Sequence, residues 1–253
     1  MEALKIYIGY DPREPIAFEV LADSLHRHAS GPLSITPIER GRNAAWGLVD
    51  RPFEMRDGVI WDQVSDAPAS TQFAATRFLT PLLAQSGPAL FMDCDILSTG
   101  DVREILAEFD PRYAVQVVQH QYVPRETMKM DRQPQTVYRR KNWSSVMLFN
   151  ADHPGNRRLT LHALNRWPGR QLHGFEWLAD SEIGTLSPRW NWLVNVQPRP
   201  DALRLAHFTL GGPWFPNWER APNDELWLEA LETFRADGRP SLTLGSEGVS
   251  SDR

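Results

Sequence analysis

The ten-residue stretch from Pro88 to Leu97 constrains the fold of this chain more than any other part of the sequence. After a Gly-Pro break, the apolar run from Ala89 to Met92 predicts a buried strand, and two carboxylates, Asp93 and Asp95, follow where that strand ends. In an open α/β sheet, ligands bind at the carboxyl ends of the strands. Asp-x-Asp can therefore present two oxygen ligands to one divalent cation, Mg²⁺ or Mn²⁺. The same tripeptide also occurs as an ordinary polar transition from strand to loop.

Composition narrows the class of protein. The chain has 253 residues, of which 42% are hydrophobic and 23% are charged, as is usual for a globular protein. A formal net charge of −5 argues against nucleic-acid binding through a generally basic surface, so we expect no nucleic-acid partner. The single cysteine, Cys94, excludes an intrachain disulfide and a cysteine-cluster zinc site, and its position within the strand end indicates a packing residue.

The sequence shows neither a membrane-spanning segment nor a signal peptide. No apolar run approaches the ~18 residues that a membrane span needs. The first residues lack the charged-then-apolar layout of a signal peptide. We therefore expect a soluble, cytoplasmic protein with no transmembrane segment.

Hydrophobic patterns predict the elements around the central strand. Leu4–Gly9 and Leu33–Ile38 are predicted strands, and the amphipathic segment from Arg13 between them is a predicted helix, which is the order of a parallel βαβ unit. Further strands are expected over 113–118, 144–150 and 203–208, and helices over 70–83, 98–109, 157–167, 175–184 and 224–235. The sequence thus predicts an α/β fold in one domain over residues 1–236, with a flexible tail over 237–253.

Two long segments lack a regular pattern. Residues 39–69 predict an irregular loop. Residues 120–141 are polar and basic, and predict either a mobile loop that closes over an anionic ligand or a solvated basic loop.

Two further parts of the sequence contain candidate ligand-binding residues. The turn Gly9-Tyr10-Asp11 would lie at the carboxyl edge of the sheet, where a nucleotide could stack on Tyr10; the alternative is a plain turn in which Asp11 caps the helix. Arg77 falls within a predicted helix and would be either a solvated side chain or a partner of Asp93 or of a phosphate.

Six segments, in this order along the chain, resemble glycosyltransferase family 8, the group with the GT-A fold that contains glycogenin and bacterial lipopolysaccharide galactosyltransferases. They are Ile8–Asp11, Thr76–Leu83, Leu90–Asp95, Asn142–Asn150, Asp180–Ile183 with Trp190-Asn191, and His207 followed by Gly211 and Pro213-Trp214. The resemblance extends from Lys5 to about Trp218. It implies a single GT-A domain with a central, mostly parallel sheet flanked by helices.

The resemblance also implies an activity and a set of site residues. Asp93, Asp95 and His207 would coordinate Mn²⁺ or Mg²⁺, and the metal would hold the diphosphate of a nucleotide sugar, a UDP-sugar. Nucleotide-sugar binding would involve Gly9, Tyr10, Asp11, Arg77, Asp93, Gly211 and Gly212, and catalysis Asp180 and Ser181. The implied activity is a metal-dependent, retaining hexosyl transfer to a glycan, a lipid-linked glycan or another acceptor.

Three positions depart from the family pattern. Gly212 stands where the family has a phosphate-binding lysine, Ser181 where it has glutamine, and Trp143 where it has asparagine. The missing positive charge could come from Lys129, Arg139, Arg140 or Lys141.

Two other functions remain open at this point. Haloacid-dehalogenase-type phosphatases also place Asp-x-Asp after an apolar strand, but they follow it with a threonine where this chain has Leu97. A transferase fold that binds a nucleotide sugar or a glycan without turnover would agree with the glycine at 212.

Overall fold

The computed structural model describes residues 2–121, 140 and 142–238. The helices are α1 (Pro15–His28), α2 (Arg40–Ala45), α3 (Thr80–Ala84), α4 (Leu161–Arg166), α5 (Gly169–His173) and α6 (Asp224–Ala236). The 3₁₀ turns are η1 (Thr76–Leu79), η2 (Val102–Glu108), η3 (Trp143–Ser145), η4 (Pro154–Arg158), η5 (Asp180–Glu182) and η6 (Pro188–Trp190). The strands are β1 (Leu4–Gly9), β2 (Leu33–Ile38), β3 (Phe53–Arg56), β4 (Val59–Asp62), β5 (Ala67–Pro68), β6 (Pro88–Met92), β7 (Ile96–Ser98), β8 (Val115–Val117), β9 (Val146–Asn150), β10 (Ile183–Thr185), β11 (Trp192–Leu193) and β12 (Leu205–His207).

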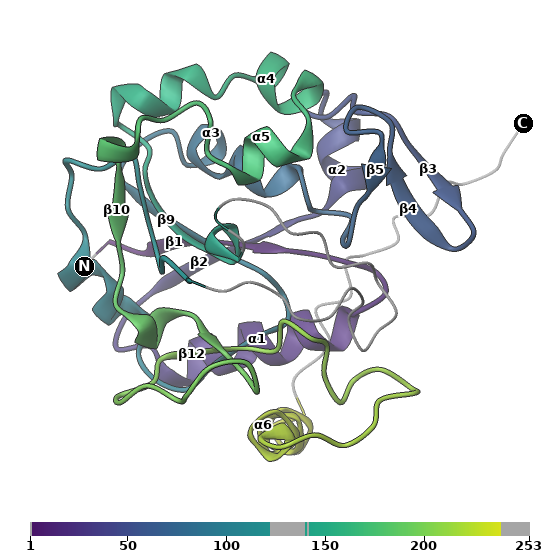
Figure 1. Cartoon of the computed structure of the whole chain (residues 1–253). Helices are drawn as coiled ribbons and strands as arrows, with labels where there is room; N and C mark the ends of the chain where they lie inside the picture. The colour runs from purple at the N-terminus through teal and green to yellow at the C-terminus, as the bar shows by residue number, and fades with distance from the viewer. Residues whose placement is uncertain (1, 122–139, 141, 239–253) are drawn as a thin grey trace, which may run out of the picture.

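The centre of the fold is a six-stranded, mostly parallel sheet in the order β10-β8-β9-β6-β1-β2. β1 runs parallel to β2 and β6, β10 runs parallel to β8, and only β9 is antiparallel to its neighbours. Figure 1 shows α1 and α6 on one side of the sheet and α3, α4 and α5 on the other. Because helices cover both faces, β6 and β9 are buried apolar strands without polar alternation. The predicted βαβ unit and the predicted α/β fold are confirmed.

Helix α1 is held by its apolar face and by its ends. Pro15 occupies the first turn, where its missing N–H costs no hydrogen bond, and basic residues occupy the last turn. The buried side chains of Phe18, Leu21 and Leu25 join the core under the sheet. Helix α6, with Trp227 and Leu231 buried, packs against α1. The predicted helices at both ends of the chain are confirmed.

A second sheet positions the end of the central strand. In it β12 lies between β11 and β7, parallel to β11 and antiparallel to β7. Because β7 follows β6 after only three residues, Asp93 to Asp95, this pairing draws β12 to the carboxyl edge of the main sheet.

The prediction of an irregular loop over residues 39–69 was wrong. The segment contains α2 and a small antiparallel sheet of β3, β4 and β5. β3 and β4 are joined by Asp57 and Gly58, both with positive φ (51° and 81°), which is the two-residue turn that matches the twist of a hairpin. The Asp-Gly pair was the sequence signal that this prediction missed.

Four predicted helices are shorter than expected. Over 98–109 the chain forms the 3₁₀ turn η2, and over 157–167 it forms the end of η4 and then α4. Over 175–184 the chain forms only the turn η5 and then strand β10, and Phe175, two residues after α5, has a positive φ of 55°. Gly184 lies in that strand, where a Cβ would come within 2.5 Å of the Tyr113 ring. Over 70–83 the helical part is limited to η1 and α3, and Pro81 occupies the first turn of α3.

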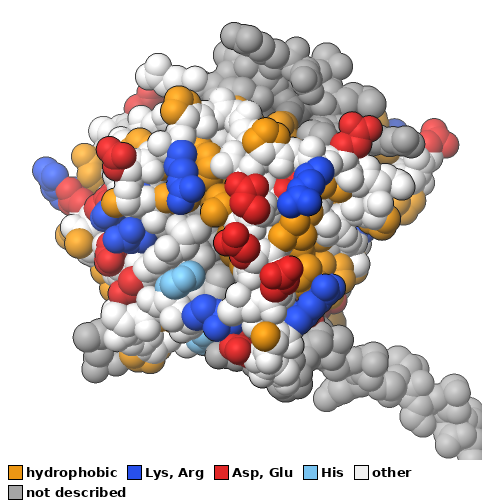
Figure 2. Space-filling model, turned by 90° about the horizontal axis from the view of Figure 1, so that it is seen from below, with side chains coloured by type: hydrophobic (Ala, Val, Ile, Leu, Met, Phe, Trp, Pro, Cys, Tyr) orange, Lys and Arg blue, Asp and Glu red, His pale blue; other side chains and the backbone are white. Residues whose placement is uncertain are grey.

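Some predictions fall outside the described residues. Residues 122–139 and 141, which make up most of the basic loop predicted over 120–141, are outside the described residues. The tail predicted over 237–253 is outside the described residues from residue 239 on. On the face shown in Figure 2, acidic and basic side chains of the described residues are interspersed. None of the helices in the described ranges is both long enough and apolar enough to span a membrane.

Candidate active site

Three potential metal ligands meet where β6 ends. Asp93 and Asp95 follow β6 directly, and His207 is the last residue of β12. β12 pairs with β7 so that His207 lies opposite Ile96, and the amide of Phe208 donates to the carbonyl of Asp95 at 2.9 Å. This pairing brings His207 Nε2 to 3.4 Å from Asp95 Oδ1. One ligand atom from each of Asp93, Asp95 and His207 lies within 4.8 Å of the others. The structure therefore brings together the three predicted metal ligands.

The chemistry of this cluster fits a divalent cation. His207 is 2% exposed, and the side chains of Asp93 and Asp95 are 13% and 17% exposed. Two ionised carboxylates in a setting with little water repel each other unless positive charge lies close to both. Carboxylate oxygens are the ligands that Mg²⁺ and Mn²⁺ prefer, and one imidazole nitrogen is an acceptable further ligand. The residues present therefore fit the metal that the sequence resemblance implies.

Arg77 links the cluster to the neighbouring strand. Its Nη1 donates to Asp93 Oδ1 at 2.8 Å and to the carbonyl of Ser144 at 2.9 Å. The side chain is almost fully buried, between the rings of Phe73 and Phe91. A buried arginine in this position supplies positive charge to Asp93 and fixes the distance between η1 and the start of β9. Of the two alternatives for Arg77, the structure shows the pairing with Asp93.

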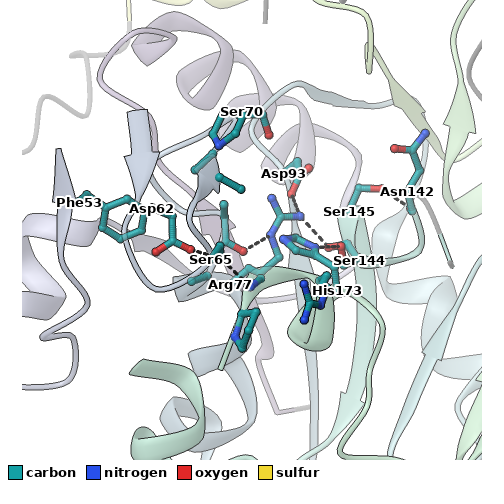
Figure 3. Close-up of a pocket in the computed structure, with 18 of the residues that line it drawn as sticks. Phe53, Asp62, Ser65, Ser70, Arg77, Asp93, Asn142, Ser144, Ser145 and His173 are labelled. Atoms are coloured by element: carbon teal, nitrogen blue, oxygen red, sulfur yellow. Dashed lines mark hydrogen bonds and ion pairs between the residues drawn. The ribbon is translucent and has the colours of Figure 1, made fainter. Parts of the chain in front are cut away.

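A cavity of about 330 Å³ opens beside the cluster. Figure 3 shows its polar side chains, several of which point toward one another across the cavity. Its lining includes Asp93, His207 and Thr209 near the cluster, Arg77, Asn142, Ser144, Ser145 and His173, and Phe53, Asp62, Ser65 and Arg170. The cavity is thus lined by the carboxyl edge of the main sheet, by the small sheet and by α5. A cavity with a few convergent polar groups is typical of a small-molecule site.

Two hydrogen-bond networks hold the walls of the cavity. His173, at the end of α5, shares a 2.7 Å hydrogen bond between its Nδ1 and Ser144 Oγ, and its ring packs edge-on against Phe78. Arg51 is buried, forms an ion pair with Asp62 at 2.5 Å and donates to the carbonyls of Leu164 and Trp167. These contacts fasten η3 to α5 and the small sheet to α4.

Comparison with known proteins places the chain in a family. No protein-family model matches the sequence. Over 242 residues the chain is 39% identical to protein CDI of Arabidopsis thaliana, an alignment that covers 93% of this chain and 88% of the plant protein. The chain belongs to the CDI family.

Solved structures identify the fold of this CDI-family chain. GlyE, a glycosyltransferase of Streptococcus pneumoniae TIGR4, superposes with a TM-score of 0.55 at 13% identity, over 95% of this chain and 66% of GlyE. The galactosyltransferase LgtC, solved with donor and acceptor sugar analogues, gives a TM-score of 0.53 at 14% identity, over 91% of this chain and 96% of LgtC. The bifunctional glycosyltransferase WbbM gives 0.55 at 14% identity, over 90% of this chain but 49% of WbbM. The chain thus spans about two thirds of GlyE and half of WbbM. The predicted resemblance to family 8 transferases and the GT-A fold are confirmed.

The predicted nucleotide turn of this CDI-family chain does not line the cavity. A Cβ on Gly9 would lie 2.3 Å from the Phe73 ring, so glycine is needed here for close packing. Tyr10 packs edge-on against Phe18. Asp11 is fully buried, and its carboxylate accepts hydrogen bonds from Arg13 and from the amide of Gln72. Burial raises the pKa of Asp11, but these hydrogen bonds outweigh burial and hold the pKa below its ordinary value. Contact of Gly9, Tyr10 and Asp11 with a nucleotide stays a prediction.

Gly211 and Gly212 form the turn after β12. Gly211 has a φ of +104°, which disfavours any residue with a side chain. A Cβ on Gly212 would lie 2.1 Å from the Trp214 ring. Trp214 packs against Phe208 and Trp227, so the lysine that family 8 has at position 212 would collide with this aromatic cluster. The role of the two glycines in donor binding stays a prediction.

The structure does not place Asp180 and Ser181 in the cavity. Both are exposed, and Asp180 forms an ion pair with Arg140, which also donates to the carbonyl of Gly174. The strand that follows them, β10, is level with Ala89 to Phe91 of β6, so the residues that precede β10 lie toward the start of β6 rather than toward its carboxyl end. Arg140 thus pairs with Asp180 and the Gly174 carbonyl, and Lys129, Arg139 and Lys141 lie outside the described residues. Catalysis by Asp180 and Ser181 stays a prediction.

Several cavity residues were not singled out from the sequence. Asn142 lines the cavity with a left-handed backbone (φ 62°), whereas Trp143, at the position of the family asparagine, turns to the carbonyl of His120. Ser144 and His173 come from segments 29 residues apart that no local pattern connects. The positive charge of Arg170 at the cavity has no sequence signal either.

Proposed function

We propose that this protein is a glycosyltransferase that moves a sugar, in hexosyl transfer, from a nucleotide diphosphate donor, a UDP-sugar, with the aid of a divalent metal. The single observation that carries the proposal is the position of the Asp93, Asp95 and His207 cluster. It lies at the carboxyl edge of a GT-A sheet and opens onto a polar cavity. The acceptor would be a glycan, a lipid-linked glycan or another hydroxyl compound, and a cytoplasmic location stays a prediction.

The residues of the site have different proposed roles. Asp93, Asp95 and His207 would hold Mn²⁺, which when bound offsets the charge that develops on a departing diphosphate. Arg77 keeps Asp93 and the Ser144 carbonyl in fixed positions. Ser144 and His173 present a hydroxyl and an imidazole to the cavity, the groups that bind sugar hydroxyls. A site built this way selects among sugars by the hydrogen bonds it can satisfy.

Retention of configuration is the proposed stereochemical outcome. Asp180 and Ser181 are the proposed groups near the sugar in the transfer step, where a carboxylate would stabilise an oxocarbenium-like state. For this role Asp180 must exchange its ion pair with Arg140 for a contact in the cavity.

A second candidate is the binding of a nucleotide sugar without turnover. The surface position of Asp180 and the glycine at 212 support this alternative. A phosphatase of the haloacid-dehalogenase type has less support, because the solved structures that resemble this chain are glycosyltransferases.

The test is release of UDP from a panel of UDP-sugars in the presence of Mn²⁺, followed with a coupled assay. We expect turnover with at least one donor, and a loss of at least about 10²-fold in Asp95→Asn, since one ligand and its charge are removed. Asp201→Asn is the matched control, because Asp201 is an exposed aspartate outside the cavity lining. Binding measured by thermal shift without UDP release would favour the non-catalytic alternative. Full activity of Asp95→Asn, or activity in EDTA, would contradict the metal-dependent mechanism.

A further inference from the structure

Asn191 connects the metal cluster to the wall of the cavity. It follows η6 directly, is fully buried, and its side chain reaches three groups from two other segments. Its Oδ1 lies 3.0 Å from His207 Nδ1, and its Nδ2 lies 2.9 Å from Ser145 Oγ and 3.3 Å from the Asn142 carbonyl. His207 belongs to the cluster, whereas Asn142 and Ser145 line the cavity.

The hydrogen bonds around Asn191 fix the orientation of its amide and place a hydrogen on Nδ1 of His207. The Asn142 carbonyl can only accept, and it accepts the single hydrogen of Ser145 Oγ at 2.7 Å. Ser145 Oγ must therefore accept from Asn191, so the amide nitrogen of Asn191 faces Ser145 and its oxygen faces His207. An amide oxygen cannot donate, so Nδ1 of His207 carries a hydrogen.

With Nδ1 of His207 donating to Asn191, Nε2 is the ring nitrogen that faces Asp95 and can act as a metal ligand. A neutral imidazole with its hydrogen on Nδ1 has a lone pair on Nε2. That lone pair lies 3.4 Å from Asp95 Oδ1, so two acceptor atoms face each other. A cation between them replaces this repulsion with attraction to both. The hydrogen bond to Nδ1 also orients the ring.

The same amide supports an unusual backbone conformation in the cavity wall. Asn142 has a left-handed backbone (φ 62°), which costs free energy for a residue other than glycine. Its carbonyl accepts from both Ser145 and Asn191, and these bonds hold the turn that leads into η3. A tighter bond between Asn191 and His207 would therefore also fix the turn at 142–145.

We propose that Asn191 is a positioning residue that fixes the tautomer of His207 and couples metal binding to the order of the cavity wall at 142–145. The inference rests on the proposed function, since it concerns the same metal site. Metal binding at His207 strengthens the Nδ1–H bond to Asn191, and Asn191 in turn holds Ser145 and the Asn142 carbonyl. The two sites are linked by a free energy of coupling, so order in the wall also favours the metal.

Three variants separate the two roles of Asn191. Asn191→Leu has a similar size and removes both the bond to His207 and the bonds to the wall. Asn191→Asp keeps an acceptor for His207 but loses the N–H donors to Ser145 and Asn142. Ser145→Ala leaves the bond between Asn191 and His207 in place and weakens the wall alone. Asn165→Leu is the matched control, because Asn165 is a buried asparagine whose side chain joins Leu48, Leu161 and the Asp50 amide outside the cavity lining.

The first measurement needs no metal and no activity. In ¹⁵N-histidine-labelled protein without metal, we expect NMR shifts of the neutral His207 ring with hydrogen on Nδ1, and loss of that pattern in Asn191→Leu. A hydrogen on Nε2, or on both nitrogens at pH 8, in the unmodified protein would overturn the inference.

The second measurement is Mn²⁺ affinity by electron paramagnetic resonance, with and without UDP. We expect Asn191→Leu to bind Mn²⁺ about 10- to 100-fold more weakly, the usual effect of losing a residue that supports a ligand. Ser145→Ala, which weakens the wall alone, should lose less affinity than Asn191→Leu, and Asn165→Leu should bind as the unmodified protein does. Asn191→Asp, which keeps the acceptor for His207 and loses the bonds to the wall, should lose no more affinity for Mn²⁺ than Ser145→Ala does, and it serves as the test if Asn191→Leu does not fold. Equal Mn²⁺ affinity of folded Asn191→Leu and the unmodified protein would overturn the inference alone. No binding of Mn²⁺ by the unmodified protein would overturn the proposed function together with it.

The third measurement is amide hydrogen exchange at residues 142–145. Mn²⁺ should slow this exchange in the unmodified protein and should have no such effect in Asn191→Asp, which holds His207 but not the wall. Slowing of equal size in both proteins would show that the wall is not coupled through Asn191.

Discussion

His120 lies buried after β8, close enough to His207 for their charges to interact, and this position makes the stability of the fold depend on pH. Burial, and then the neighbouring charge of His207, lower the pKa of His120 from 6.5 to about 4. As the pH falls, the unfolded chain therefore takes up a proton at this histidine before the folded chain does. The stability that the neutral His120 contributes is fully present above pH 6.5 and is lost between pH 6.5 and about 4.

The size of this loss of stability follows from the two pKa values of His120, in the unfolded and in the folded chain. A difference of one unit between the folded and unfolded pKa corresponds to about 1.4 kcal/mol of stability. The stability lost by pH 5 is therefore about 2 kcal/mol, and the loss reaches about 3 kcal/mol below pH 4. Replacement of His120 by glutamine removes this titration. It leaves intact the hydrogen bond from Trp143 Nε1, which goes to the backbone carbonyl of His120.

The assay is urea unfolding followed by tryptophan fluorescence at pH 8, 6.5 and 5, without metal. We expect the unmodified protein to lose about 2 kcal/mol more than His120→Gln between pH 8 and pH 5. His162→Gln controls for the loss of a histidine, because His162 is exposed on α4. If the unmodified protein and His120→Gln have the same pH dependence, the argument from burial is refuted.

Three further outcomes are expected. Gly212→Ala should lower Tm by roughly 3–10 °C, because its Cβ would meet the Trp214 ring. Gly41→Ala is the control and should leave Tm unchanged, since no atom lies closer than 3.8 Å to a Cβ there. An unchanged Tm of Gly212→Ala would contradict this packing. If Asp180 acts in the transfer step, Asp180→Asn should lower kcat about 10²-fold and leave KM for the donor nearly unchanged. A normal kcat would show that Asp180 has no role in transfer and would leave it a structural role, such as its ion pair with Arg140. Cys94 is fully buried, and burial raises its pKa, so a thiol reagent should label it only after unfolding; rapid labelling of the folded protein would show an opening at the strand end.

The order of the main elements could be predicted because local patterns determine them. The apolar run of β6 and the alternation of β1 are read within a few residues, and the Gly-Pro break marks where β6 begins. The hairpin of β3 and β4 carried a comparable signal in Asp57-Gly58, so its omission was an error of interpretation. The segment at 175–184 is different. Phe175 has a positive φ and its ring packs against Phe78 and Trp177, and packing between distant segments of this kind cannot be derived from the local sequence.

In the candidate site, too, residues with a local sequence signal could be predicted, and contacts between distant segments could not. Asp93 and Asp95 could be predicted from one strand end, and His207 from its resemblance to a family pattern, because each stands at the end of a short strand. The partners that give these residues their chemistry could not be predicted. Asn191 acts on His207 only because η6 brings its amide between β12 and the turn at 142–145. Asn191 has one amide with two donors and one acceptor, and all three functions are used by groups from other segments. A sequence pattern can thus locate the ligands of a metal, whereas the tautomer of a ligand and its coupling to the cavity wall depend on contacts between distant segments.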